Sequence, residues 1–190
     1  MNALDFAAAS AAVSDSALSS QTPDFDRSVA IFGAAEGLPP LLAAGRAITS
    51  HALRDAMTAA FGGTDAQGFW QWKDAYEACE TAQVLFLRKY GAAMQAKAGD
   101  PAVLLGMLQK LAGLLPSHTK RTAESEALQQ LSTPLPLAFI AARAAGLIPS
   151  DIVLEPSAGT GMLAIFAALA GGRLALNEPA DTRAGLLGYS

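Results

Sequence analysis

One stretch near the C-terminal end, residues 151–161, constrains the fold of this chain more than any other. Its sequence, Asp-Ile-Val-Leu-Glu-Pro-Ser-Ala-Gly-Thr-Gly, places an apolar segment, an acid and a glycine loop before a second apolar segment that opens at Met162. This order predicts a strand, a tight turn and a helix, and a second strand follows over 173–177. Such a βαβ unit builds a parallel sheet and offers a small-molecule site at the carboxyl ends of its strands.

The acid at the end of the first strand, Glu155, discriminates between the ligands that such a loop can hold. The pattern Gly159-x-Gly161-x-x-Ala164, with Glu178 about 20 residues on, formally matches the dinucleotide fingerprint. A pyrophosphate would meet the negative field of Glu155, at a cost on the order of 1 kcal/mol. S-adenosylmethionine has no phosphate and carries a sulfonium and an ammonium cation, so Glu155 favours it. A dinucleotide, or a turn whose glycines serve only packing, is the alternative.

Two further segments complete the predicted pocket. Glu178 ends the second predicted strand, where its carboxylate can accept hydrogen bonds from both ribose hydroxyls, or can be a solvent-exposed acid. In residues 130–134, Gln-Leu-Ser-Thr-Pro, Ser132 or Thr133 before the proline is the predicted N-cap of a helix over 137–145. The free amides of that helix start can also bind the carboxylate of a methionine moiety.

These segments carry a resemblance to a known family. Gln-x-Ser-Thr-Pro at 130–134, Val-Leu-Glu-Pro-Ser-Ala-Gly-Thr-Gly at 153–161 and Leu-Asn-Glu at 176–178 resemble the opening of the N6-adenine DNA methyltransferases. More narrowly, the chain resembles the methylase-like N-terminal region of bacterial strawberry notch-like and phage antirestriction methylase–helicase proteins. The resemblance implies a Rossmann-like class I methyltransferase fold, S-adenosylmethionine as cofactor, and DNA and a C-terminal helicase domain as partners in the full-length protein. The cofactor contacts that it implies are Thr133, Pro134, Glu155, Pro156, Ser157, Ala158, Gly159, Gly161 and Glu178.

The sequence departs from this family at the catalytic step. The motif that holds the flipped adenine, Asn/Asp-Pro-Pro followed by an aromatic residue, does not occur in the 190 residues. We therefore expect a truncated part of a longer protein, with half of a cofactor site, no catalytic residue and no methylation activity of its own. A non-catalytic scaffold or DNA-docking module of an antirestriction methylase–helicase system is the alternative from another class, and a fragment of an NAD-dependent oxidoreductase is a third.

The whole chain predicts an α/β protein that is predominantly helical, in three parts. Residues 1–28 are rich in Ala and Ser and predict a disordered tail. Residues 29–128 predict a helical accessory region, irregular over 29–45 and helical over 50–61, 65–90, 101–114 and 119–130. Residues 129–190 predict the N-terminal part of the methyltransferase domain, ending in a helix over 181–188. Two parallel strands alone leave open edges and an uncovered sheet face, so we expect loose packing after residue 150.

Composition narrows the class of protein further. Apolar residues make up 52% of the chain and the mean hydropathy is +0.29, but the longest apolar run, residues 162–172, is too short to span a bilayer. The N-terminus has no basic segment of the kind that opens a secretory signal, and a single cysteine excludes an internal disulfide. These features predict a cytoplasmic protein without membrane partners. The net charge of −4 gives no general attraction to nucleic acid, so any DNA contact has to be local.

The remaining candidate side chains favour structural roles. His51 and His118 lie far apart in the sequence without ligand-spaced partners, so we expect no metal site. Cys79 lies on the apolar face of its predicted helix and indicates an inert core thiol. Trp70 and Trp72 could stack a base, but core packing is favoured. The basic residues Lys110, His118, Lys120 and Arg121 predict a solvated face, with a phosphate contact as the alternative.

Overall fold

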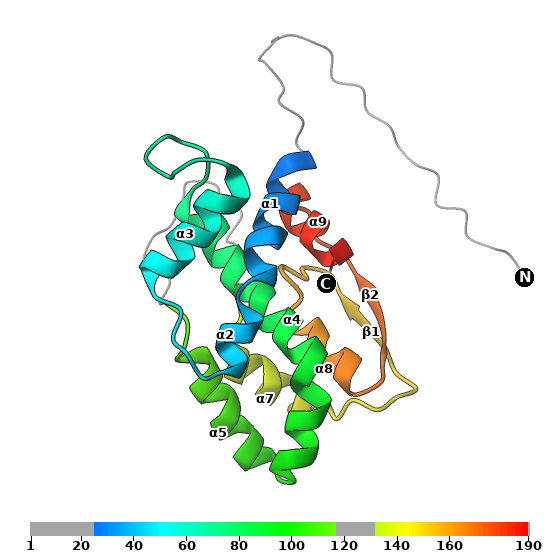
Figure 1. Ribbon diagram of the computed structural model, residues 1–190. Helices are drawn as coiled ribbons and strands as arrows, with labels where there is room; N and C mark the ends of the chain where they lie inside the picture. The colour runs from blue at the N-terminus through cyan, green and yellow to red at the C-terminus, as the bar shows by residue number, and fades with distance from the viewer. Residues whose placement is uncertain (1–24, 117–131, 190) are drawn as a thin grey trace, which may run out of the picture.

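The structure is a computed structural model that describes residues 25–116 and 132–189 (Figure 1). Its helices and strands follow in the order α1 (Phe25–Glu36), α2 (Pro39–Ala43), α3 (Ser50–Phe61), α4 (Trp72–Ala98), α5 (Pro101–Ala112), α7 (Leu135–Ala145), β1 (Ile152–Glu155), α8 (Ala164–Leu169), β2 (Arg173–Leu176) and α9 (Asp181–Tyr189). Helices dominate the described residues, and β1 pairs with β2 in parallel, so the α/β, predominantly helical class is confirmed.

Helix α4 is the centre of the molecule. It is 27 residues long and packs against α1, α2, α3, α5 and α8 (Figure 1). Most of its side chains between Asp74 and Leu87 are buried, which leaves little of its N-terminal half in contact with water. The largest fully buried apolar side chains come from segments throughout the described chain: Ile31, Leu53, Met57, Trp70, Leu87, Leu108, Leu135 and Leu186. One core therefore joins the N-terminal helices to the βαβ segment.

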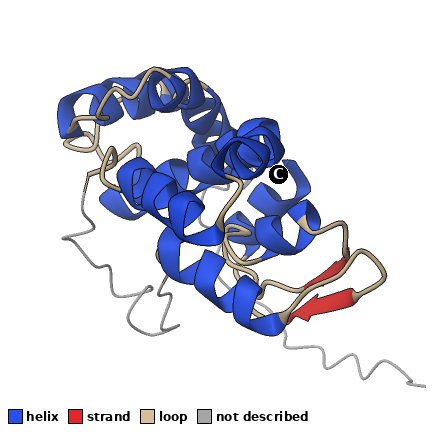
Figure 2. Ribbon diagram, turned by 90° about the horizontal axis from the view of Figure 1, so that it is seen from below, coloured by secondary structure: helices blue, strands red, loops and turns tan. Residues whose placement is uncertain are grey.

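The sheet lies at one corner of the molecule, with helices on one side of it (Figure 2). The pairing aligns Ile152 with Arg173 and Glu155 with Leu176, and α8 connects and contacts both strands. On the opposite side, Ile152 is 67% and Leu154 is 69% exposed. Alternate residues of a strand point to opposite faces, so the apolar face that carries these two side chains is uncovered in this structure.

Helix boundaries with a strong chemical signal were predicted correctly. Helix α3 has the predicted bounds, and Gly62 ends it at φ 72°. Its N-cap is Thr49, whose Oγ1 accepts from the amide of Ala52 at 3.1 Å, so Ser50, the N-cap candidate in the sequence, is instead the first helical residue. Helix α5 begins after Asp100, whose Oδ1 accepts from the amides of Ala102 and Val103 at 2.7 and 3.3 Å. A left-handed glycine and an acid before proline decide these ends locally.

The N-terminal part differs from the prediction. Helix α1 begins at Phe25, inside the predicted tail, and α1 and α2 occupy most of the segment predicted as irregular. Apolar side chains explain the difference, because Ile31, Leu38 and Leu42 are each at most 3% exposed in the core. The predicted helix over 119–130 and residues 1–24 of the predicted tail lie outside the described residues.

Helix α4 begins later and ends later than predicted. It starts at Trp72, where Gln71 and Asp74 form a capping box, and it runs through Gly91 to Ala98. Gly91 does not end the helix, because its role is close packing: a Cβ there would lie 2.7 Å from Cδ1 of Leu169 in α8. The glycine lets α8 approach α4, which is a tertiary function that the local sequence does not reveal.

The side chains assigned to the core behave as predicted. Trp70 is 1% exposed and its Nε1 donates to the carbonyl of Gly63 at 3.0 Å. Its ring contacts that of Trp72 edge-on, with centroids 5.8 Å apart. Cys79 is 1% exposed, and burial, with a smaller effect of the Glu80 charge, raises the pKa of its thiol to about 12. Such a thiol stays protonated and unreactive.

Candidate cofactor site

The predicted glycine loop lies between β1 and α8. After Glu155 the chain turns through residues 156–163, and α8 begins at Ala164, two residues later than predicted. Gly159 and Gly161 adopt φ values of 58° and 92°, which side chains other than glycine rarely tolerate. A Cβ at Gly161 would also lie 3.3 Å from Leu187 of α9. Both glycines are therefore required by the backbone of this turn.

Glu178 holds this loop in place. Its Oε2 accepts from the amide of Gly159 at 2.7 Å, and its Oε1 accepts from the amide of Ala180 at 3.0 Å. Glu178 follows the carboxyl end of β2, as the sequence predicted for its position, and its carboxylate contacts the loop that follows β1. The structure adds a role that the sequence did not predict, because the carboxylate is bonded to backbone donors of the loop.

Asn177 extends the contact between the two strand ends. Its amide donates to the carbonyl of Glu155, its own carbonyl accepts from the amide of Ala158, and its Nδ2 donates to the carbonyl of Pro156, each at 2.9 Å. These bonds continue the β1–β2 pairing past the last strand residues. The loop is consequently fixed from the β2 side by two consecutive residues, Asn177 and Glu178.

Helix α4 fixes the loop from the other side. Thr160 is 3% exposed, and its Oγ1 donates to Oε2 of Glu80 at 3.1 Å. Glu80 lies 80 residues earlier in the chain and is itself 7% exposed. The sequence does not predict this pair, because no motif or periodic spacing links two residues that lie 80 positions apart. A buried hydrogen bond thus anchors the glycine loop to the helical region.

A buried ion pair lies next along α4. Nε of Arg183 in α9 donates to Oε1 of Glu77 at 2.8 Å, and Nζ of Lys73 is 3.9 Å from the same oxygen. Glu77 is 2% exposed, and its Oε2 has no hydrogen-bond partner among the described residues. Burial raises the pKa of Glu77, against the opposing effect of Arg183 and Lys73. Buried acids of α4 therefore hold both α9 and the glycine loop.

Glu155 differs from the other acids of the site. Its side chain is half-buried, and none of the described residues forms an ion pair or a side-chain hydrogen bond with it. Loss of hydration on partial burial raises the pKa of its carboxyl. A partly dehydrated carboxylate without a partner attracts a cation more strongly than one that is fully hydrated.

The structure places Thr133 and Pro134 directly before α7. The N-cap of α7 is Pro134, with no side-chain cap, so the prediction that Ser132 or Thr133 caps this helix is wrong. Pro136, at the second helical position, has no N–H, so this helix start has one fewer amide for a cap to satisfy. The hydrogen bonds that fix the glycine loop come from Glu80, Asn177 and Glu178. Gln130 lies outside the described residues, as do His118, Lys120 and Arg121 of the predicted basic cluster.

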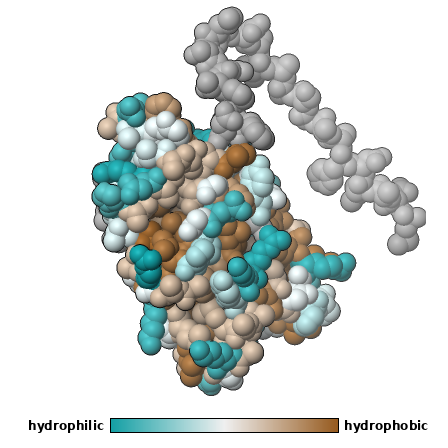
Figure 3. All heavy atoms as spheres, viewed as in Figure 1, coloured by the Kyte–Doolittle hydropathy of each residue, from teal (hydrophilic) through white to brown (hydrophobic). Residues whose placement is uncertain are grey.

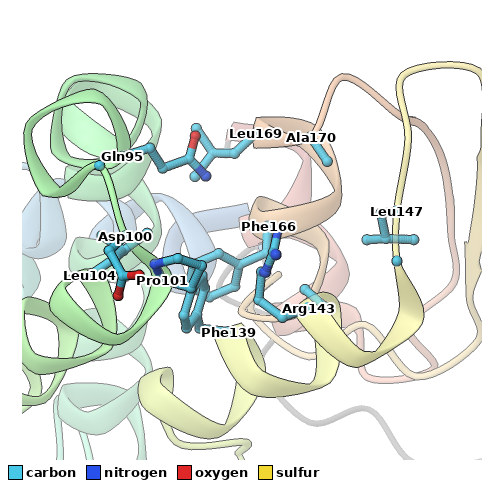
Figure 4. A pocket seen from close by; sticks show the side chains of 13 residues that line it. Gln95, Asp100, Pro101, Leu104, Phe139, Arg143, Leu147, Phe166, Leu169 and Ala170 are labelled. Carbon is cyan, nitrogen blue, oxygen red and sulfur yellow. The ribbon is translucent and has the colours of Figure 1, made fainter.

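A separate cavity of about 340 Å³ lies at the other end of α8 (Figure 4). Its walls come from the C-terminal parts of α4, α7 and α8 and from the start of α5. The nine predicted cofactor contacts do not line it. The cavity is therefore distinct from the glycine loop, which lies at the N-terminal end of α8.

The described surface gives few further indications of a site. The face in Figure 3 mixes apolar atoms with scattered hydrophilic side chains. No group of three or more His, Cys, Asp or Glu side chains within residues 25–116 and 132–189 could hold a metal ion. The helices in the same ranges are all too short or too polar to cross a membrane.

Comparison of the chain with protein-family models, with curated proteins and with solved structures finds no match in any of the three.

Proposed function

We propose that this chain is the S-adenosylmethionine-binding part of a DNA adenine-N6 methyltransferase, linked to a helicase in the full-length protein. The observation that carries the proposal is Glu155, a half-buried carboxylate without an ion-pair partner among the described residues, at the end of a strand that leads into a glycine loop. The order strand, glycine loop, helix and parallel strand supports the Rossmann-like fold that this proposal implies.

The charge of the site favours a methyl donor over a dinucleotide. Glu155 and Glu178 both lie at the carboxyl ends of the two strands, and Glu178 contacts the loop directly. A pyrophosphate against these charges would be destabilised by about 1–3 kcal/mol for each close acid. The sulfonium and ammonium groups of S-adenosylmethionine gain by a similar amount. The electrostatic interaction with Glu155 and Glu178 is thus unfavourable for a dinucleotide and favourable for S-adenosylmethionine.

Glu178 keeps the capacity to bind a ribose. A carboxylate has about four lone-pair positions, and the backbone amides of Gly159 and Ala180 occupy two of them. The two others can accept from the ribose hydroxyls. In this proposal Glu178 both fixes the loop and holds the sugar, whereas Glu155 attracts the cationic methionine end.

Calorimetric titration tests the proposal with three ligands: S-adenosylmethionine, S-adenosylhomocysteine and NAD⁺. We expect the intact chain to bind S-adenosylmethionine and to bind NAD⁺ at least about tenfold more weakly. Glu155→Gln should weaken S-adenosylmethionine more than S-adenosylhomocysteine, because only the former carries the sulfonium charge. Glu36→Gln, at an exposed acid of α1, is the matched control. Tighter binding of NAD⁺ would overturn the proposal, and so would an equal loss for both sulfur ligands.

Glu178→Ala should weaken S-adenosylmethionine by about tenfold or more, since it removes charged acceptors of ribose hydrogen bonds. The same change releases the amides of Gly159 and Ala180, so thermal unfolding of the variant should be measured beside binding. Equal binding by variant and parent would contradict the ribose assignment.

A non-catalytic scaffold is the second candidate. A scaffold predicts no saturable binding of S-adenosylmethionine by the chain or by the full-length protein. Binding without transfer of a methyl group to DNA by the full-length protein would instead indicate a cofactor-binding domain that has lost its chemistry.

A further inference from the structure

The cavity at the C-terminal end of α8 has the size and composition of a small-molecule site. Its volume, about 340 Å³, falls within the range of about 300–1,000 Å³ that ligand pockets occupy. Three of its apolar walls, Leu104, Phe139 and Phe166, are each 5–6% exposed. The two phenylalanine rings are tilted, with centroids 5.6 Å apart, which gives the cavity an aromatic surface.

Two opposite charges line the cavity on either side of Phe139 (Figure 4). Arg143, in the last turn of α7, is exposed and forms no ion pair with any described residue. Asp100 uses Oδ1 to cap α5, and within the described chain its Oδ2 has no hydrogen-bond partner. The lining thus offers a guanidinium fork and one carboxylate oxygen.

Helix ends of both signs also line the cavity: the N-terminus of α5, at Asp100 and Pro101, carries partial positive charge, and three C-termini carry partial negative charge. Gly99, Gly146 and Ala170 are the C-caps of α4, α7 and α8, and all three line the cavity. Helix C-termini carry partial negative charge and favour cations. A ligand with only an anionic group would gain from Arg143 but face these three ends. A ligand with only a cationic group would face Arg143.

We propose that this cavity binds a small apolar molecule that carries both an ammonium and a carboxylate group, namely an apolar α-amino acid. The carboxylate pairs with the Arg143 guanidinium, whose planar fork matches a carboxylate. The ammonium group lies towards Asp100 and the carbonyl ends of the helices. The apolar side chain packs on Phe139 and Phe166. This site is independent of the cofactor proposal, since its residues come from the opposite end of α8.

Titration calorimetry of the full chain with L-phenylalanine, L-leucine and L-methionine tests the site. We expect saturable binding of at least one of these amino acids at a single site. Two analogues of L-phenylalanine separate the charges: hydrocinnamate lacks the ammonium group and phenethylamine lacks the carboxylate. Each should bind at least about tenfold more weakly than L-phenylalanine. Equal binding by either analogue would overturn the zwitterion assignment, and no saturable binding of the three amino acids would overturn the site.

Matched variants locate the site in the molecule. Arg143→Gln removes the guanidinium, and Asp100→Asn removes the charge but keeps a good helix cap. Both should weaken L-phenylalanine by at least about tenfold, whereas Arg46→Gln, at an exposed arginine outside the cavity, should bind as the parent does. Ala142→Phe narrows the cavity and should abolish binding. Thermal unfolding identifies variants that keep their fold, and unchanged binding by folded Arg143→Gln would overturn the assignment.

Discussion

At the scale of single residues, the buried acids of α4 determine how the βαβ segment is held. Glu77 and Glu80 lie one turn apart on the central helix of the core, and each bonds a residue from the last quarter of the chain. A buried carboxylate needs hydrogen-bond donors, because burying an unpaired charge is strongly unfavourable. Arg183 donates to Glu77 and Thr160 donates to Glu80. The same burial raises the pKa of Glu77, so the contribution of this side chain to stability depends on pH.

Glu77→Gln should change how stability depends on pH. Burial raises the folded pKa of Glu77 above its ordinary value of 4.5, so the stability that its protonated form contributes is present below pH 4.5. That stability is lost as the pH rises through the folded pKa. The charges that face it, Lys73 and Arg183, oppose the shift and Glu80 adds to it. We expect the free energy of unfolding of Glu77→Gln to rise relative to the parent as the pH rises above about 4.5.

Urea unfolding at several pH values measures this difference. Glu77→Gln also loses the ion pair with Arg183, which lowers the free energy of unfolding at every pH at which the pair forms. The prediction therefore concerns how the difference between variant and parent changes with pH, and not the size of that difference at one pH. Glu36→Gln, at an exposed acid, should give a difference that is nearly constant over the same range. A relative stability of Glu77→Gln that falls as the pH rises would contradict the raised pKa.

At the scale of elements, the contact between α1 and α9 depends on a small residue. Gly185 in α9 faces Ser28 in α1, and a Cβ there would lie 2.8 Å from both side-chain atoms of Ser28. Gly188, one turn later in the same helix, would have nothing within 4 Å of such a Cβ. The two glycines thus form a matched pair, one in the contact and one outside it.

We expect Gly185→Ala to destabilise the protein by about 1–3 kcal/mol, because the added methyl group forces α9 away from α1. Gly188→Ala should stabilise it slightly, by less than about 1 kcal/mol, because alanine favours a helix more than glycine does. Thermal or urea unfolding of both variants measures the difference. Equal effects of the two substitutions would show that α9 does not pack on α1 as described.

Element boundaries show where the sequence was sufficient for prediction. Gly62, Asp100 and Pro101 fix helix ends through their own backbone and side-chain chemistry, so α3 and the start of α5 were predicted. Gly91 looked like a helix end but serves the approach of α8. In the site, the positions of Glu155 and Glu178 at strand ends followed from the pattern. The bond between Thr160 and Glu80 did not, because it joins residues 80 positions apart.

At the scale of the whole molecule, the described chain has one well-packed part and one open part. The core is centred on α4, whereas the outer face of the two-stranded sheet carries Ile152 and Leu154 in contact with water. A sheet of two strands has few cross-strand bonds and an unpaired edge on each side. Local stability should therefore differ strongly between these two parts.

Hydrogen exchange measures this difference directly. We expect backbone amides of Ile152, Val153 and Leu154 to exchange at least about tenfold faster than those in the buried part of α4, because local opening of the sheet exposes little additional apolar surface. Leu87 and Ala82, both at most 1% exposed, provide internal references. Equal protection of the two sets in a monomer would contradict an uncovered sheet face.

The long separation between the partners of α4 has a consequence for synthesis. Arg183 follows Glu77 by 106 residues, and Thr160 follows Glu80 by 80 residues. At about 5–20 residues per second, a ribosome takes about 5–20 s to reach Arg183 after adding Glu77. During that interval Arg183 and Thr160 are absent from the nascent chain, so the bonds that they form with this face of α4 cannot yet be made. The helical region can complete its core only after the βαβ segment has left the ribosome.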